Sequence, residues 1–204
     1  MLLNSDRSKY NNLKDSEAWD LLRRGDHHAL EYLYRRYGKD LFNFGMKLYG
    51  KHEWVQDTLQ ELFVDLWKNH LKLSNVTSLK TYLFKAFKYK LQRQYDREKR
   101  WAYVDYQMLP QMEVELPEEN RIISAQMSFD QQVKLAKALE KLSVRQREVL
   151  HLLFHENLSY EEVSIIMEIT VRSVYTLAWK AISSLRKLIV DLVFLFLFTS
   201  FFFF

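Results

Sequence analysis

The sequence of 204 residues has no cysteine, only four glycines and only two prolines. Without cysteine the chain can form neither disulfide bonds nor thiolate metal sites, which fits a reducing compartment. Glycine and proline are the residues that most often interrupt helices, so their scarcity favours long helices with short connections. Before the extreme C-terminus we find no convincing alternation of polar and apolar residues that would predict strands. These absences predict an all-α protein.

Other features are also missing. The chain has no glycine-rich phosphate loop, no nucleophile elbow and no convincing pair of catalytic carboxylates. We therefore expect that the protein is not an enzyme and needs no cofactor. Its opening residues are polar after the first three, so no signal peptide is predicted and we expect a cytoplasmic protein. Apolar residues make up 48% of the chain, enough for one large or two small folded domains.

An acidic amphipathic helix is predicted within residues 57–67. Its apolar residues recur at i, i+3, i+4, i+7 and i+8, at Leu59, Leu62, Phe63, Leu66 and Trp67. Asp57, Glu61 and Asp65 recur every four residues and form a negative ridge on another face of the helix. We call these three carboxylates the acidic ridge. A ridge of this kind suits a basic protein partner.

A basic helix is predicted after the polar stretch 74–78. Its basic residues outnumber its acidic residues. The basic residues are Lys80, Lys85, Lys88, Lys90, Arg93, Arg97, Lys99 and Arg100. Aromatic residues lie among them, at Tyr82, Phe84, Phe87, Tyr89 and Tyr95. Cations bind a phosphate backbone and aromatic rings stack on bases, so the pattern indicates a nucleic-acid surface. An ordinary solvated helix face is the alternative.

Capping signals divide the rest of the chain into helices. Ser16 and Asp26 are placed to cap helices that end at Gly25 and Gly50. Capping boxes begin at Ser143 and Ser159, and Thr170 can cap a helix over residues 171–189. The helix 160–167, the short turn 168–170 and the helix 171–189 form a helix-turn-helix pattern. We expect the last helix to bury Val174, Ala178, Ala181, Ile182 and Leu185. It should expose Arg172, Tyr175, Thr176, Trp179 and Ser183 for entry into a major groove.

Two parts of the chain resemble bacterial sigma factors of the extracytoplasmic-function (ECF) group. The pattern Asp57-x-x-Gln60-Glu61-x-Phe63-x-x-x-Trp67 is similar to the signature with which these proteins bind core RNA polymerase. The segment 78–86 resembles the start of their promoter −10 helix, and the segment 142–187 resembles their −35-reading domain. The order of the two parts and the linker between them also match. The resemblance implies two small helical domains.

The family resemblance implies roles for individual residues. Core polymerase would be bound by Asp57, Gln60, Glu61, Asp65 and Trp67. The −10 element would be bound by Asn75, Thr77, Lys80, Tyr82, Lys85, Lys88, Tyr89 and Arg93. The −35 element would be bound by Arg172, Ser173, Tyr175, Thr176, Trp179 and Lys180. For Trp67, a purely structural role in the core remains an alternative.

The chain departs from the family pattern at four positions. Glu168 stands where the family usually has a turn glycine, and a non-glycine residue in a left-handed conformation costs about 1 kcal/mol. Tyr175 and Leu177 stand where cations are common, and Tyr89 stands where the family has asparagine. The bases read at both promoter elements are therefore left open.

We expect four segments. They are a region 2-like domain at 16–101, an acidic linker at 102–127, a region 4-like domain at 128–190 and a phenylalanine-rich tail at 191–204. The linker could occupy a basic channel or serve as a solvated tether. Besides core polymerase and promoter DNA, the resemblance implies an anti-sigma factor as a partner.

The sequence also raises the questions of a membrane contact, of a competing function and of a metal site. As a helix, Leu192–Phe204 would reach only about 20 Å, short of a hydrocarbon core of about 30 Å, so we do not expect it to span a membrane. The tail and the basic helix could instead contact a membrane surface, and an ordinary helix-turn-helix regulator is the other competing function. His151 and His155 are four residues apart, but no Glu completes a zincin motif and no third ligand is evident. We therefore predict no metal site.

Overall fold

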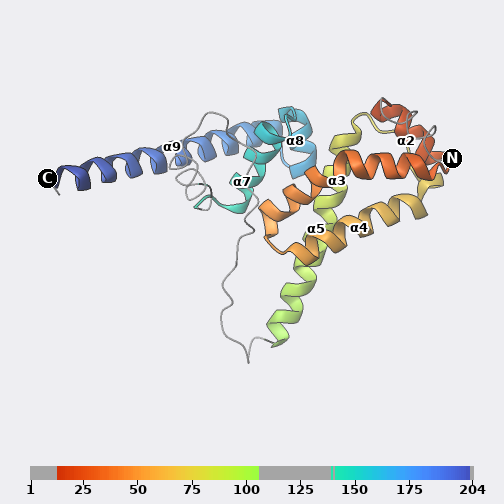
Figure 1. The fold of residues 1–204 in the computed structure, drawn as a ribbon, viewed down its shortest axis with the longest axis horizontal. Coiled ribbons are helices and arrows are strands. Elements are labelled where there is room, and N and C mark those ends of the chain that lie inside the picture. The colour runs from red at the N-terminus through yellow and green to blue at the C-terminus, as the bar shows by residue number, and fades with distance from the viewer. Residues whose placement is uncertain (1–12, 106–138, 140, 203–204) are drawn as a thin grey trace, which may run out of the picture. The chain divides into compact units, whose positions relative to one another are not determined.

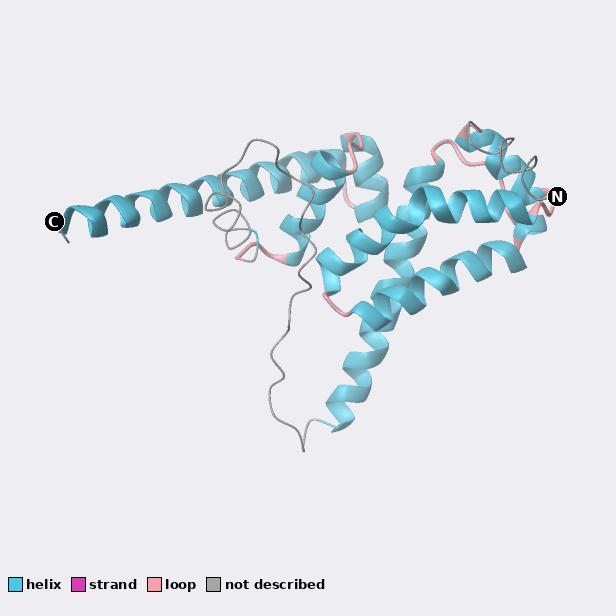
Figure 2. Ribbon diagram, viewed as in Figure 1, coloured by secondary structure: helices cyan, strands magenta, loops and turns pink. Residues whose placement is uncertain are grey.

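The structure is a computed structural model that describes residues 13–105, 139 and 141–202 (Figure 1). The chain divides into two units, Met1–Glu113 and Val114–Phe204. In the described part of both units helices are joined by short connections, and no strand occurs there (Figure 2). The predicted all-α fold is therefore confirmed. Most of the predicted acidic linker lies outside the described residues, although its first residues, 102–105, belong to a helix.

The first unit is a bundle of α-helices in which two long helices contact all the others. Its elements are α2 (Asp15–Arg23), α3 (His27–Tyr49), α4 (His52–Lys68), the short 3₁₀ helix η1 (His70–Lys72) and α5 (Leu79–Asp105). Helix α3 contacts α2, α4 and α5, and α4 also contacts α5. Helix α5 likewise contacts α2, α3 and α4, so the apolar residues of α3 and α5 together supply the centre of the core.

Aromatic side chains fill that core. Phe44 of α3 and Phe84 of α5 are fully buried, with ring centroids 5.2 Å apart. Phe87, one turn after Phe84, is fully buried as well. The sequence analysis grouped Phe84 and Phe87 with rings available for bases, and that interpretation is wrong. Helical spacing places both on the inner side of α5, where packing against α3 decides their role.

The helix ends follow most of the predicted signals. The Asp26 carboxylate accepts hydrogen bonds from the backbone N–H groups of His28 and Ala29, as a capping residue should. Gly50 ends α3 in a left-handed conformation with φ 67°. The predicted cap at Ser16 is wrong because α2 begins one residue earlier. The position before α2 is Lys14, whose backbone N–H donates to the Glu17 carboxylate at 3.0 Å.

The second unit contains the helix-turn-helix. Its elements are α7 (Val144–Leu150), the π-helical turn η2 (His151–His155), α8 (Tyr160–Met167) and α9 (Val171–Phe202). Both predicted capping boxes form, since Ser143 accepts from the N–H of Gln146 and Ser159 accepts from that of Glu162. Thr170 accepts from the N–H of Ser173 and so caps α9. The predicted helix after Ser143 therefore begins correctly but changes to π geometry at His151.

The core of this unit comes from all of its helices. The most deeply buried apolar residues are Val149, Leu152, Val163, Ile166, Met167, Val174, Ala178 and Ala181. Ile182 was predicted to be buried, but 41% of its surface is exposed. Backbone helix continues in α9 to Phe202, through most of the predicted tail. Among the described helices, none combines enough length with enough apolar character to cross a bilayer.

Of the glycines Gly25, Gly38 and Gly45, the last has the closest neighbours, which gives a test of the packing. A Cβ at Gly45 would lie 2.7 Å from Val55 Cγ1 and 3.1 Å from Phe87 Cε1, whereas a Cβ at Gly38 would come no closer than 3.8 Å to Tyr34. We expect Gly45→Ala to lower the free energy of unfolding by about 1–3 kcal/mol through overpacking. Gly38→Ala, in the same helix, should be neutral or stabilise by up to about 1 kcal/mol. Urea denaturation of both variants checks this; equal stability of the two would contradict it.

Candidate polymerase and nucleic-acid interfaces

Helix α4 places the acidic ridge opposite its buried side. Leu59, Leu62, Phe63 and Leu66 are buried, while Asp57, Gln60 and Glu61 are exposed and Asp65 is partly exposed. The apolar face thus fixes the orientation of the helix, and the carboxylates face outward in a row. Asp57 is the carboxylate of the ridge nearest the N-terminus of α4, and it has no ion-pair partner among the residues that the structure describes.

Lys90 of α5 joins the basic helix to the acidic ridge. Its Nζ atom lies 2.8 Å from Glu61 Oε1 and 2.5 Å from Asp65 Oδ2. Burial lowers the pKa of Lys90, but hydrogen bonds to the Asp65 and Glu61 carboxylates outweigh it and raise the pKa above its ordinary value. The sequence analysis grouped Lys90 with the cations of a nucleic-acid surface. The structure corrects this, because two of the three ridge carboxylates share one lysine.

Trp67 lies in the last turn of α4. Its ring stacks on His70 of η1, with centroids 5.1 Å apart and an interplanar angle of 20°. The Nδ1 atom of His70 lies 2.6 Å from the Trp67 carbonyl oxygen. Trp67 is only partly exposed, so it is not one of the fully buried residues of the core. The stacking pair leaves part of the indole available at the surface near the ridge.

The loop between η1 and α5 is held by α2. The Trp19 indole N–H donates to the Ser74 carbonyl at 3.0 Å, and Arg23 Nε donates to the Leu73 carbonyl at 2.8 Å. Arg23 also donates to the Asn75 side chain. The side chains of Asn75 and Thr77 are exposed in this loop. The sequence analysis gave no role to Trp19 or Arg23, and nothing in the local pattern could, because both lie 50 residues or more from the loop.

The basic helix presents one mixed cationic and aromatic stripe. Tyr82, Lys85, Tyr89 and Arg93 follow each other at three- and four-residue spacing, so they lie on the same side of α5. Tyr89 is 63% exposed, and the Arg93 guanidinium carbon lies 5.9 Å from its ring centroid. Lys85 is exposed, while Lys80 and Lys88 are partly exposed. This stripe offers cations and one open ring to a ligand.

Tyr82 is less accessible than Tyr89. Its ring meets Trp19 edge to face at a centroid distance of 5.2 Å, and burial raises the pKa of its hydroxyl. Trp19 therefore contacts both the loop and the start of the stripe. This arrangement fixes the position of the loop relative to the basic helix.

All six residues predicted to read the −35 element are exposed in the second unit. They are Arg172, Ser173, Tyr175, Thr176, Trp179 and Lys180. Tyr175 stacks on Tyr160 of α8, with centroids 3.9 Å apart and planes at 10°, and Trp179 is 69% exposed. Glu168 has φ 54°, so the predicted left-handed turn residue is confirmed. This surface is rich in aromatic rings and has few cations.

Comparisons with known proteins identify both units. The model of Sigma-70 region 2 matches residues 33–101, and the model of Sigma-70 region 4 matches residues 132–185. Together these matches span more than half of the chain. The chain belongs to the sigma-70 family. Its recognition from the acidic ridge and the helix-turn-helix is thus confirmed. Sigma factors are DNA-binding regulatory proteins that act with core RNA polymerase in transcription initiation, and they are not enzymes.

Solved structures share the fold of this sigma factor. One is the sigma factor RpoE in complex with the anti-sigma factor NepR from Bartonella quintana, with TM-score 0.61, 20% identity, and coverage of 78% of this chain and 94% of that chain. Another is CnrH in complex with the cytosolic domain of CnrY, with TM-score 0.61, 20% identity, and coverage of 87% and 97%. No curated protein sequence matches the chain. In family terms, the acidic ridge, the loop and the basic stripe all lie in region 2, and the aromatic surface lies in region 4.

The contacts of Arg23 predict that α2 controls the order of the 73–78 loop. Arg23→Met should remove the two hydrogen bonds to the loop, together with the exposed one to Asp20, and lower the stability of region 2 by about 1–3 kcal/mol. Hydrogen exchange of the loop amides should become faster. Arg24→Met is the matched control, since Arg24 is the exposed neighbour at the end of α2. Unchanged loop exchange in the folded Arg23→Met protein would contradict the assignment.

Proposed function

We propose that this protein is an ECF-type sigma factor that binds core RNA polymerase and directs promoter-specific initiation through −10 and −35 recognition. The observation that carries the proposal is the pair of outward surfaces on region 2, one acidic and one cationic with an open aromatic ring. A helix-turn-helix regulator needs a DNA-reading surface but no such pair. The cytoplasmic location expected from the sequence is the one that this function requires.

Core binding is assigned to the acidic ridge together with Gln60 and Trp67. Carboxylates suit this role because charge-assisted hydrogen bonds to arginine fix the register of two helices. Asp57 is available for such a bond directly, whereas Glu61 and Asp65 already contact Lys90. A basic partner must therefore share these two carboxylates with Lys90 or displace it. The ridge thus has one open position and two that bind in competition with an internal cation.

We assign binding of the −10 strand to the 73–78 loop and the basic stripe. Asn75 and Thr77 would contact a base flipped out of the duplex, and the cations of α5 would bind the backbone beside it. Flipping a base costs a few kcal/mol of stacking, which the contacts must offset. The tethering of the loop by Trp19 and Arg23 supports this role, since a pocket that is ordered before binding loses less entropy.

The −35 element is assigned to the exposed surface of α9. Among the six residues assigned here only Arg172 and Lys180 are cations, so these residues would make few phosphate contacts; the exposed Arg186 and Lys187 lie further along α9. Tyr175 and Trp179 would instead offer apolar contact, for example with thymine methyl groups in the major groove. The Tyr160–Tyr175 stack supports such a role because it holds one ring in a fixed orientation.

An anti-sigma factor is proposed as a further partner. RpoE, which shares the fold, was solved in complex with the anti-sigma factor NepR. Such a partner would have to cover surfaces that this chain needs for polymerase or DNA. The acidic ridge and the exposed rings of region 4 are the surfaces that it would have to compete for.

Run-off transcription tests the proposed function. Purified core polymerase with this protein and no other sigma factor should initiate at defined start sites. Asp57→Lys should weaken core association at least about tenfold, because one charge-assisted hydrogen bond contributes about 1.5–3 kcal/mol. Glu31→Lys is the control, since Glu31 is an exposed carboxylate on α3. No initiated transcript from the wild type would refute the function. Wild-type affinity of folded Asp57→Lys would refute the role of the ridge alone.

Tyr89 provides a test of the −10 surface. Tyr89→Ala should weaken binding of a single-stranded −10 oligonucleotide by about 1–3 kcal/mol, the contribution of stacking on one base. Tyr89→Phe keeps the ring and should retain nearly all of the affinity. Fluorescence anisotropy with holoenzyme measures both variants at one salt concentration. An equal loss in both variants would show that the hydroxyl, rather than the ring, makes the contact.

A further inference from the structure

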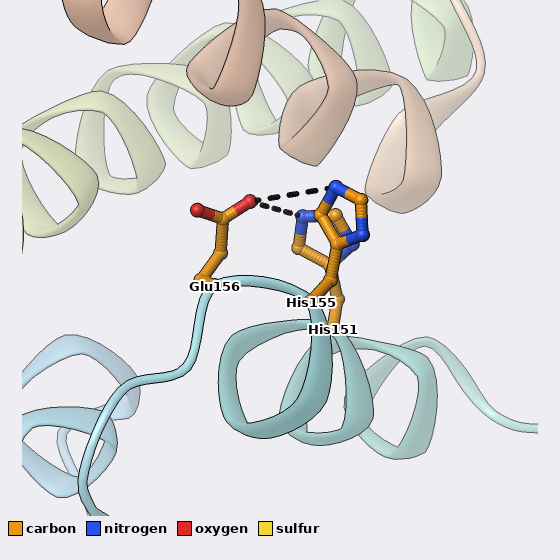
Figure 3. A group of neighbouring side chains, drawn as sticks. All are labelled: His151, His155 and Glu156. Atoms are coloured by element: carbon orange, nitrogen blue, oxygen red, sulfur yellow. Dashed lines mark ion pairs between the residues drawn. The ribbon is translucent and has the colours of Figure 1, made fainter. Parts of the chain in front are cut away.

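The π-helical turn η2 and the residue that follows it gather three side chains whose ligating atoms converge (Figure 3). Nε2 of His151 lies 3.1 Å from Oε1 of Glu156, and Nε2 of His155 lies 3.9 Å from the same oxygen. The two imidazole rings are stacked, with centroids 4.6 Å apart. One ligating atom from each residue lies within 4.8 Å of the other two. Two nitrogen atoms and one carboxylate oxygen thus surround a common point.

The π-helical turn creates this arrangement. The N–H of Glu156 donates to the carbonyl of His151 at 3.0 Å, an i→i+5 bond that is characteristic of π geometry. In a regular α-helix, residues four apart share a face and residues five apart do not. The π turn moves Glu156 to the side that holds His151 and His155. The sequence analysis assumed α-helical spacing, and for that reason it found no third ligand.

The ligand set fits a divalent transition-metal ion. Zinc binds histidine nitrogen and carboxylate oxygen at about 2.0–2.2 Å, so ligands around a tetrahedral ion lie about 3.3 Å apart. The distances of 3.1 and 3.9 Å from Glu156 Oε1 lie on either side of this value. Calcium and magnesium prefer sites made only of oxygen ligands. Two imidazoles and one carboxylate therefore favour zinc or a similar ion.

The three side chains differ in burial, which gives an ion both a protected binding environment and a route of entry. The side chains of His151 and Glu156 are 8% and 2% exposed, while that of His155 is 44% exposed. A buried carboxylate is stabilised by nearby positive charge, which a divalent cation would supply. The exposed imidazole of His155 leaves one side of the site open to solvent.

We propose that His151, His155 and Glu156 bind one Zn²⁺ ion or a similar divalent transition-metal ion. The ion has three protein ligands, and water completes its coordination on the side of His155. Binding joins the two ends of η2 and so fixes the turn that precedes α8 of the helix-turn-helix. This site is independent of the proposed contacts with polymerase and promoter DNA, because it shares no residue with them.

Titration of the full-length protein with Zn²⁺ tests the site. After removal of bound metal by a chelator and dialysis, calorimetry should give one ion per chain. Co²⁺ in its place should produce the visible absorption of a four-coordinate ion with nitrogen and oxygen ligands. His155→Gln should weaken binding at least about tenfold, because even outer-shell partners of a metal contribute that much. Mg²⁺ at the same concentration should give no saturable binding.

Two further variants complete the experiment. Glu156→Gln keeps the shape of the side chain but removes its charge, and it should weaken binding as His155→Gln does. His28→Gln is the matched control, since His28 also lies beside a carboxylate, at 3.8 Å from Glu31, but belongs to no candidate metal-binding group among the described residues; it should bind like the wild type. Circular dichroism verifies that each variant folds. If Glu156→Gln does not fold, the affinity of His155→Gln decides, because His155 is half-exposed and its substitution disturbs the core less. Absence of 1:1 binding in the wild type, or wild-type affinity in folded His155→Gln, would overturn the proposal.

Discussion

The close approach of α3 to α4 and α5 at Gly45 is the constraint on which region 2 depends. Any side chain there would press on Val55 of α4 and on Phe87 of α5, so three helices meet at a position that only glycine fits. This contact sets how α4 and α5 lie against each other. Their outward surfaces follow from it, since each helix buries one apolar face and exposes the rest. The acidic ridge and the basic stripe are thus two consequences of one packing arrangement.

Lys90 shows that these two surfaces are not electrically separate. It lies on the basic helix, yet its ammonium group contacts two carboxylates of the acidic ridge. The attraction draws α5 toward α4 at the surface, as the aromatic core does in the interior. A basic partner on the ridge would release part of this internal bond, so we infer that core binding alters the electrostatic surroundings of α5. The stripe that we assign to the −10 strand begins on the same helix.

The sequence predicted features that depend on neighbours along the chain. The caps at Asp26, Ser143, Ser159 and Thr170 formed as expected because they need only residues two or three positions away. Features set by distant contacts were missed. The tether from Arg23 to the loop spans some 50 residues, and the inward turn of Phe84 depends on α3. The π turn at His151 was missed for a different reason: helical periodicity assumes one regular geometry, and a single wider turn rearranges every side chain after it.

Regions 2 and 4 differ in the cations and aromatic rings that they expose, which suggests how each would contribute to binding a promoter. Counterion release makes phosphate contacts weaken steeply with salt, while ring contacts respond much less. Region 2 exposes or partly exposes Lys80, Lys85, Lys88 and Arg93, whereas the residues that we propose for −35 recognition in region 4 include Tyr175 and Trp179 beside two cations. We infer that the cations of region 2 carry most of the salt-dependent affinity. Region 4 would then contribute mainly orientation, because Tyr175 is held against Tyr160 and the two rings gain contact only when the groove fits them.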